Sequence, residues 1–586
     1  MLNMKPACWV MSCMLAFGAA GETMVIHSDR LEVKCDPAAG TFTIGQRGAD
    51  RPFVSGGRLA GQGGQGKVAE VVDNTFGKGS SIEVRHLDGR VDRISLFDGV
   101  PFTVFGSTLR NGAAEMVVVN HVGLAEFDLD LGRPVAELRV LGTGGLSEFG
   151  KSAPGSYMWQ VVADPQTRRG VVGGWLSAER GSGVLFPDVG GGVARINARL
   201  EHGRLQLPVG NEAVLDSFVI GVFDDARLGM EAWADVVAKV QNIHLPPQPS
   251  GYCTWYHAGA WNEKGIARQA EFAERNLKPW GFSVVQIDDG WQDGQTKNGP
   301  RKNFTRVREN GPYKLGMKET ADRIKAAGLL PGIWLMPFSG SPEDPWYEGH
   351  RDWFVKQADG KPHESPWGGA CLDMTHPGAR AYVRDEIKHI VKDWGYQYLK
   401  MDGLCSGAGV RHVYVNDGYR DDKMGDAVFY DPAKTNIEAF RDGLRLVREA
   451  AGADVYLLGC TVAQNMRAYG GGMGLVDAMR IGPDNNSAWK AIPTGPRYGT
   501  RNYHLNGRIW HNDPDCIYAR PGVPMNQAQL LATWVTLSGQ LGLSSEEFSR
   551  LPPERLDLLR RTMPAHGLAA RPVDLFEREM PRIWMV

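Results

Sequence analysis

The chain has 586 residues, which is too long for one ordinary domain, so we expect two or three. Hydrophobic residues make up 42% and charged residues 23%, as in globular proteins with sizeable cores. The 65 Lys and Arg residues nearly balance the 67 Asp and Glu residues, giving a net charge of −2 without a basic tail or stripe. This balance argues against nucleic acid and against anionic membrane surfaces as partners.

The first twenty residues have the pattern of a secretory signal peptide. Lys5 is followed by an apolar run from Ala7 to Phe17 and by small residues from Gly18 to Ala20. A charged start, a short apolar core and a small-residue cleavage site are typical of such signals, and the run is too short to span a bilayer. The alternative is a buried N-terminal helix. We expect residues 1–20 to be removed and the protein to be exported, periplasmic or extracellular, without membrane insertion.

Eight cysteines are present, two of them within the expected signal. The other six have no C-x-x-C spacing, which argues against a zinc site, and a chain of this size needs no disulfide framework. After export one or two bridges are expected, one of them between Cys371 and Cys405.

Residues 24–243 are predicted to form a β-sandwich domain. Runs rich in strand-forming residues, such as Ser81–Arg85, Met116–Val119 and Leu215–Val222, are separated by Gly, Asp-Gly and Asn-Gly turn signals. Few segments here show a helical period. The Pro-rich stretch His244–Gly251 then predicts a linker and the domain boundary.

Residues 251–565 are predicted to form a catalytic (β/α)8 barrel. Short apolar runs alternate with amphipathic stretches, which implies a parallel sheet, and eight such units in roughly 300 residues match the size of this barrel. A doubly wound open sheet is the competing fold, but no Gly-rich phosphate turn follows the first strand. The expected strands are Tyr252–Trp255, Val284–Ile287, Gly332–Met336, Tyr398–Met401, Val455–Leu458, Ala478–Arg480, Arg508–Trp510 and Thr536–Ser538.

Residues 566–586 are predicted to begin a C-terminal β-unit. A helix expected at Leu551–Leu559 is followed by Val573–Phe576 and Arg582–Val586, which have the composition of two opening strands. We expect this unit to be truncated or rudimentary.

Polar side chains lie at the carboxyl ends of the expected barrel strands, the end that carries the active site in such barrels. Lys400 and Asp402 end the fourth strand, and Asp484 follows the sixth. Retaining glycoside hydrolysis needs two carboxylates, one that attacks the sugar and one that transfers a proton. Asp402 and Asp484 are therefore the predicted catalytic pair.

Each of these signals has a simpler explanation when it is taken alone. The alternatives are a turn at Asp288–Gly290, a solvated ion pair of Lys400 with Asp402, a structural salt bridge of Arg480 with Asp484, a loop cap at Asn512–Asp515 and a thiol within the core at Cys460. Their shared position at one end of one barrel favours a site.

Six short motifs occur in order between about residues 251 and 576. They are Gly251–Trp255, Ile287–Gln292, Leu399–Asp402, Leu458–Cys460, Arg480–Asp484 and Asn512–Asp515. Together they resemble the α-galactosidase clan, in particular glycoside hydrolase family 36, which includes melibiases and the raffinose-synthase branch. The resemblance implies hydrolysis of terminal α-linked galactose-type residues of an oligosaccharide or glycan, with no cofactor and no metal ion.

The resemblance also implies individual roles. Asp402 is the expected nucleophile and Asp484 the general acid/base. The implied substrate-binding residues are Trp255 and Trp291 as apolar walls, Asp288 and Asp289 at O4 and O6, Lys400 at O3 and O4, Cys460 and Arg480 near the 2-position, and Asp513. We further expect Lys400 to lie beside Asp402, and the nearby negative charge and burial to raise the pKa of Asp484 so that it holds its proton in the free enzyme.

Three other functions stay open. An α-N-acetylgalactosaminidase or a transglycosylase would share both carboxylates and differ in the pocket for the 2-substituent or in the acceptor site. A non-catalytic sugar-binding protein is the alternative of another class, and the presence of both carboxylates argues against it.

Overall fold

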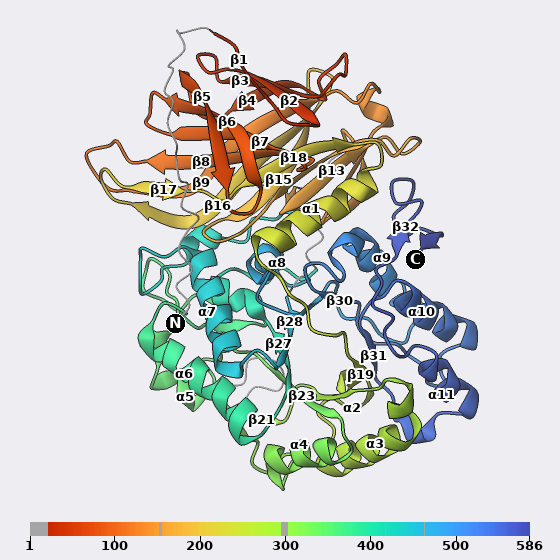
Figure 1. The fold of residues 1–586 in the computed structure, drawn as a ribbon. Helices are drawn as coiled ribbons and strands as arrows, with labels where there is room; N and C mark the ends of the chain where they lie inside the picture. Colours follow the sequence, from red (N-terminus) through yellow and green to blue (C-terminus); the bar gives the residue numbers. More distant parts are fainter. Residues whose placement is uncertain (1–21, 152–154, 295–302, 416–417, 462) are drawn as a thin grey trace. The chain divides into compact units, whose positions relative to one another are not determined.

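The computed structural model describes residues 22–151, 155–294, 303–415, 418–461 and 463–586. The chain divides into two compact units, Met1–Asn242 and Ile243–Val586. They run from red to yellow and from yellow-green to blue in Figure 1. The expected signal peptide, residues 1–20, lies outside the described residues.

The first unit contains two antiparallel sheets. In spatial order, one sheet consists of β1 (Met24–His27), β2 (Leu31–Asp36), β3 (Thr41–Gln46), β4 (Val54–Leu59), β9 (Val117–Leu129), β16 (Val193–Leu207), β15 (Ser182–Gly190) and β12 (Ser156–Tyr157). The other consists of β11 (Gly145–Glu148), β10 (Arg139–Gly142), β13 (Trp159–Ala163), β14 (Gly170–Trp175), β18 (Phe218–Phe223), β8 (Thr103–Arg110), β7 (Val91–Phe97), β6 (Gly77–His86) and β5 (Gly64–Asp73), with β17 (Glu212–Val214) paired to β8.

Aromatic rings from both sheets meet in the core of this unit. Phe42 and Phe127 come from β3 and β9 of the first sheet, and Phe105 and Phe218 from β8 and β18 of the second. The ring centroids of Phe42 and Phe127 lie 5.3 Å from that of Phe105, and those of Phe127 and Phe218 are 5.5 Å apart. All four side chains are buried, so the two inner faces share one apolar core and the predicted β-sandwich is confirmed.

One helix of the first unit was not predicted. Helix α1 (Ala226–Val240) begins at Asp225, whose side chain accepts a hydrogen bond from the Arg227 amide. Its buried residues include Met230, Trp233 and Val237, which follow helical spacing. A β-carbon at Gly174 of β14 would lie 2.3 Å from Trp233 Nε1, so glycine there lets the helix approach the sheet.

The second unit is built on a parallel eight-stranded sheet. In spatial order its strands are β31 (Gly542–Ser544), β19 (Ser250–Cys253), β20 (Val284–Ile287), β23 (Leu330–Leu335), β27 (Tyr398–Asp402), β28 (Tyr456–Cys460), β29 (Ala478–Arg480) and β30 (His511–Asp513). The Leu541 amide donates to the Asn512 carbonyl oxygen over 2.8 Å and links the two end strands. The predicted barrel is thereby confirmed.

Helices alternate with these strands along the chain (Figure 1). The main ones are α3 (Glu263–Asn276), α4 (Gly316–Ala326), α6 (Pro377–Lys388), α7 (Asn436–Ala451), α8 (Arg467–Gly472), α9 (Thr494–Arg501), α10 (Met525–Leu537) and α11 (Pro553–Arg560). In the described part of the chain, no helix is both long and apolar enough to cross a membrane.

Smaller elements lie in the connections. They are α2 (Trp255–Ala258), α5 (Pro345–Glu348), the pair β21 (Gln292–Asp293) and β22 (Asn303–Val307), the sheet of β24 (Ser339–Gly340), β25 (Glu364–Ser365) and β26 (Gly369–Cys371), and the pair β32 (Arg571–Pro572) and β33 (Trp584–Met585). The strands β32 and β33 lie within residues 566–586, which were predicted to begin a C-terminal β-unit.

The last two predicted barrel strands were misplaced. The seventh strand is β30, three residues after the expected Arg508–Trp510. The eighth is β31, whereas the expected Thr536–Ser538 lies at the end of α10. There the Thr536 hydroxyl donates to the Ala532 carbonyl oxygen over 2.8 Å, so this β-branched residue is accommodated within a helical turn.

The predicted disulfide between Cys371 and Cys405 is wrong. Both residues are free, buried thiols, as are all six cysteines in the described residues. Cys371 lies in an apolar cluster with Val355, Ala427, Phe429 and Ala439. Core contacts, and not a cross-link, therefore hold this side chain.

Candidate active site

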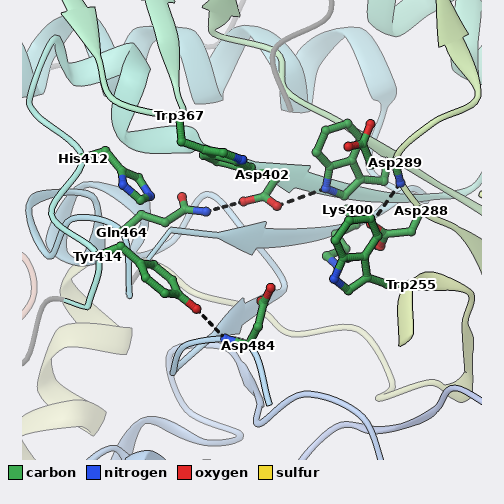
Figure 2. A pocket seen from close by; sticks show the side chains of 11 residues that line it. Trp255, Asp288, Asp289, Trp367, Lys400, Asp402, His412, Tyr414, Gln464 and Asp484 are labelled. Carbon is green, nitrogen blue, oxygen red and sulfur yellow. Dashed lines mark hydrogen bonds and ion pairs between the residues drawn. The ribbon is translucent and has the colours of Figure 1, made fainter. Parts of the chain in front are cut away.

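A pocket of about 340 Å³ lies at the carboxyl ends of the barrel strands (Figure 2). Its lining residues are Trp255, Asp288, Asp289, Trp334, Trp367, Lys400, Asp402, His412, Tyr414, Gln464 and Asp484. Eight of them lie in a barrel strand or within four residues after one, and the strands are β19, β20, β23, β27, β28 and β29. Trp367 lies in the turn between β25 and β26, and His412 and Tyr414 lie in the connection after β27.

One end of the pocket is strongly polar. Asp288 Oδ2 accepts hydrogen bonds from Lys400 Nζ over 2.8 Å and from Gln286 Nε2 over 2.7 Å. Asp289 Oδ1 accepts from Gln292 Nε2 over 2.6 Å. Burial lowers the pKa of Lys400, but the negative charge of Asp288 outweighs this effect and raises the pKa well above its usual value. Lys400 therefore presents a fixed positive charge among acids that can accept hydrogen bonds from sugar hydroxyls.

Asp402 is held by three donors. Its Oδ1 accepts from Gln464 Nε2 over 2.6 Å and from the Gly403 amide over 2.7 Å, while Oδ2 accepts from Trp334 Nε1 over 3.1 Å. The expectation that Lys400 serves as the cation beside Asp402 is not met, because Lys400 forms its ion pair with Asp288. The orientation of the Asp402 carboxylate comes from these N–H donors.

Asp484 shares an arginine with a second, deeply buried carboxylate. Arg480 Nη2 donates to Asp484 Oδ1 over 3.0 Å and to Asp515 Oδ2 over 3.1 Å. The same oxygen of Asp515 accepts from the Tyr256 hydroxyl and, over 2.8 Å, from the Asn485 amide. Asp515 is buried, whereas 53% of the Asp484 side chain is exposed toward the pocket. The exposed carboxylate is therefore the one that a substrate can reach.

The two carboxylates on Arg480 have opposite pKa shifts. Burial raises the pKa of Asp484, but the charges of Arg480 and Lys400 outweigh it and hold the pKa below the ordinary value. Burial raises the pKa of Asp515 to about 6, and Arg480 opposes that rise. The expectation that Asp484 holds its proton in the free enzyme is thus not met, because the charges of Arg480 and Lys400 outweigh the effect of burial on its pKa.

Replacing Asp515 with Asn is expected to remove a pH dependence of stability between about pH 4 and pH 6. The pKa of the Asp515 carboxyl is about 6 in the folded protein and about 4 in an unfolded chain, so its ionisation lowers the free energy of unfolding by about 2–3 kcal/mol as pH rises through this range. An asparagine cannot ionise, and its side-chain oxygen can still accept hydrogen bonds from Arg480 and from the Asn485 amide. The free energy of unfolding in urea, compared between variant and wild type, is therefore expected to shift in the variant's favour from pH 4 to pH 7. A difference that does not change with pH would contradict the raised pKa.

Four predicted site residues do not line the pocket. Trp291 is fully buried, and its Nε1 donates to the Trp334 carbonyl oxygen over 2.9 Å. It therefore supports a pocket wall instead of forming one, because the strand directs Trp334 inward. Cys460 and Arg480 are buried in β28 and β29, behind the lining. Asp513 is buried as well and accepts from the Asp515 amide over 2.8 Å.

Five lining residues were not predicted. Trp334 lies within the predicted strand Gly332–Met336, near its carboxyl end, so its position could have been predicted. Gln464 lies shortly after Cys460, which was a predicted site residue, so Gln464 could also have been predicted. Trp367, His412 and Tyr414 lie in long connections without any periodicity, where the sequence gives no indication of their direction.

Within the described ranges, no group of three or more His, Cys, Asp or Glu side chains is arranged to hold a metal ion. The pocket offers carboxylates, one amine and aromatic rings, which suit a neutral polyhydroxylated ligand.

Fold and site together define a class of protein: a (β/α)8 barrel with paired acids at its strand ends is the arrangement of glycoside hydrolases. Residues 261–417 match the family model Melibiase, which confirms the resemblance to α-galactosidases. The match includes Lys400 and Asp402 and ends before Asp484.

Known proteins agree with this class. An "A type blood alpha-D-galactosamine galactosaminidase" of Flavonifractor plautii is 26% identical over 143 residues, which is 22% of this chain and 12% of that protein. The chain therefore matches only a small part of the length of this curated relative.

Solved structures share the fold. The α-galactosidase TtGalA of Thermus thermophilus superposes with a TM-score of 0.56 at 18% identity, covering 79% of this chain and 93% of that one. The GH36 α-galactosidase AgaA of Geobacillus stearothermophilus gives 0.63 at 12% identity, covering 92% and 85%. The galactosidase domain of the α-galactosidase-sucrose kinase AgaSK gives 0.66 at 13% identity, covering 93% and 85%.

Proposed function

We propose that this protein is an exported glycoside hydrolase that removes terminal α-linked galactose-type residues with retention of configuration. One observation carries the proposal: Asp402 and Asp484, which follow or end two different strands, face the same pocket beside the polar end formed by Asp288, Asp289 and Lys400 (Figure 2). The Melibiase match supports the galactose-type substrate.

In the first step, an oxygen of Asp402 attacks the anomeric carbon. The bond from that carbon to the leaving oxygen breaks, and Asp484 delivers its proton to the leaving oxygen. In the second step, Asp484 takes a proton from water, the water oxygen bonds to the anomeric carbon, and Asp402 leaves as a carboxylate. Two inversions at one carbon give net retention.

Asp484 needs a proton at the start of this cycle. In the free protein its pKa is lowered, so it is largely ionised at neutral pH. A sugar that fills the pocket removes water from around Asp484, and desolvation raises the pKa of a carboxyl group. We infer that the proton is taken up when substrate binds, and not held beforehand.

A second candidate is hydrolysis of an α-linked galactosamine derivative. The observation that favours it is the similarity to the galactosaminidase of Flavonifractor plautii. The two activities differ only at the sugar's 2-position, which the catalytic carboxylates do not distinguish. Transfer to a sugar acceptor instead of water would use the same two carboxylates.

The test is a panel of nitrophenyl glycosides: α-galactoside, α-N-acetylgalactosaminide, α-galactosaminide, α-glucoside and β-arabinopyranoside. Release of nitrophenol from the α-galactoside that disappears in the Asp402→Asn variant is the expected result. Release from an amino sugar alone would favour the second candidate. A folded protein that cleaves none of them, yet is stabilised against heat by galactose, would be a binding protein and would overturn the proposal.

Export rests on the sequence pattern of residues 1–20. When the full chain is expressed in a host with a general secretory pathway, the protein is expected in the exported fraction. N-terminal sequencing is expected to start at Gly21. An intact Met1 on protein retained in the cytoplasm would contradict this part of the proposal.

A further inference from the structure

Behind the proposed general acid lies a second carboxylate that the mechanism does not use. Asp484 lines the pocket (Figure 2), whereas the Asp515 side chain is only 4% exposed. Arg480 Nη2 donates to Asp484 over 3.0 Å and to Asp515 over 3.1 Å. The two acids are therefore close enough to share one proton and one counter-charge.

Tyr256 connects the two acids. Its hydroxyl donates to Asp515 Oδ2. Burial raises the pKa of Asp484, whereas the nearby cations and hydrogen bonds from Arg480 and Tyr256 lower it. The Tyr256 hydroxyl thus has both carboxylates within hydrogen-bonding reach. A hydroxyl can donate one proton and accept another, and it rotates to suit its partners. It can therefore receive a proton from one acid while it gives its own proton to the other.

The buried acid keeps a proton to higher pH than the exposed one. Burial raises the pKa of Asp515 to about 6, while the pKa of Asp484 lies below its ordinary value. At about pH 5 the pair in the free protein therefore carries one proton, and that proton lies on Asp515. A sugar in the pocket desolvates Asp484, which raises the pKa of Asp484 and favours movement of the proton to it.

The surroundings of Asp515 stabilise its carboxylate once the proton has left. Asp515 Oδ2 accepts hydrogen bonds from Arg480 Nη2 and, over 2.8 Å, from the Asn485 amide. Asn485 is buried and is held in turn by the Tyr518 hydroxyl, which donates to Asn485 Oδ1 over 2.5 Å. The titratable or charged groups that interact with Asp515 are Arg480, Asp484, Asp513, Tyr256, Cys516 and Tyr518. Arg480 is the cation of this set, and it remains paired whichever acid is ionised.

We propose that Asp515 supplies, through Tyr256, the proton with which Asp484 protonates the leaving group. This inference rests on the proposed function. When the sugar binds, the O–H bond of Asp515 breaks as its proton moves to the Tyr256 oxygen, and the Tyr256 proton moves to Asp484. Asp515 becomes a carboxylate, Tyr256 stays neutral, and Asp484 becomes the neutral acid.

The same route resets the site after hydrolysis. In the second step Asp484 takes a proton from water, and this proton returns through Tyr256 to Asp515 when the product leaves. Asp515 and Tyr256 thus act through Asp484, as residues that position its proton.

The test uses two galactosyl substrates that differ in their need for an acid. The sugar leaving group of raffinose must be protonated, whereas α-galactosyl fluoride releases fluoride ion without a proton. In Asp515→Asn at pH 6, kcat/KM for raffinose is expected to fall at least about tenfold further than kcat/KM for the fluoride. The alkaline limb of kcat/KM for raffinose is expected near pH 6 in the wild type. In the variant only Asp484 can hold the proton, so the limb is expected at least about two units lower.

Tyr256→Phe tests the route separately. It keeps both carboxylates and Arg480 but removes the hydroxyl, so the same selective loss on raffinose is expected. Asp477→Asn is the matched control, because Asp477 also pairs with an arginine, Arg448, over 2.6 Å and lies directly before β29, away from the pocket. It is expected to change neither value. Thermal unfolding checks that each variant is folded, and if Asp515→Asn does not fold, Tyr256→Phe decides.

Two results are distinguishable failures. Equal losses on raffinose and on the fluoride in these variants, in a wild-type enzyme that cleaves both, would overturn the relay and leave the proposed function standing. A wild-type protein that cleaves neither substrate nor any glycoside of the panel would overturn the proposed function and this inference with it. If the panel identifies an amino sugar instead, the same pair of substrates is built on that sugar, and equal losses again overturn the relay.

Discussion

Replacing Asp402 with Gly is expected to lower kcat on a nitrophenyl galactoside by about 10⁴-fold or more, as loss of a covalent nucleophile does in other hydrolases. The side chain is held by Gln464, Trp334 and the Gly403 amide, none of which can itself attack carbon. The cavity left behind is large enough for a small anion. Added azide is therefore expected to restore a large part of the rate.

The product of this rescue reports the stereochemistry. Azide entering from the position of Asp402 would give the β-galactosyl azide, whereas the wild-type enzyme would first release α-galactose. Both products are identified by proton NMR. A wild-type enzyme that first releases β-galactose, or a variant that retains a tenth of its activity without azide, would contradict the assignment of Asp402 as the nucleophile.

Replacing Lys400 with Met is expected to destabilise the protein by about 3–5 kcal/mol, because it leaves Asp288 as an uncompensated buried charge. The two side chains are only 6% and 3% exposed, and their 2.8 Å contact is buried. The pKa of Lys400 is raised, so this stability is fully present below the lysine pKa of the unfolded chain. It is lost only as pH rises through the higher pKa of the folded state. At neutral pH the whole effect is expected in urea unfolding.

Two further variants control this prediction. Lys318→Met breaks a surface pair with Asp322 at 2.6 Å, in which the side chains are 63% and 47% exposed, and is expected to cost less than about 1 kcal/mol. The double variant Lys400→Met with Asp288→Asn is expected to recover part of the lost stability, because no buried charge remains. A Lys400→Met variant as stable as Lys318→Met would show that the buried pair is not a stabilising element.

Local pattern and spacing were sufficient for most of the architecture. The alternation of apolar runs with amphipathic stretches predicted the barrel, and its first six strands lie at or beside their expected positions. Pattern failed where tertiary context decides. Trp534–Ser538 mixes strand-forming and helix-compatible residues and became helical, while α1 was overlooked although Met230, Trp233 and Val237 follow helical spacing.

The candidate site was predictable to the extent that strand ends determine it. Asp288, Asp289, Lys400, Asp402 and Asp484 all line the pocket. Lys400 and Asp402 are alternate residues of β27, and the other three follow the carboxyl ends of β20 and β29. The acid that pairs with Lys400 was not predictable, because Lys400 forms its ion pair with Asp288, which follows a different strand. The positions of Trp367, His412 and Tyr414 were not predictable either, since they depend on contacts between distant connections, such as the hydrogen bond from the His412 amide to Ser365 Oγ.

The six buried thiols make it possible to measure, by alkylation, when each unit of the protein unfolds. Burial raises the pKa of Cys35 and of Cys405 to about 12, so in the folded state these sulfurs are almost entirely protonated and react slowly with alkylating reagents. Labelling must then wait for local or global unfolding. Cys35 lies in the first unit and the other five in the second, so mass spectrometry of the labelled peptides would time the opening of each unit separately.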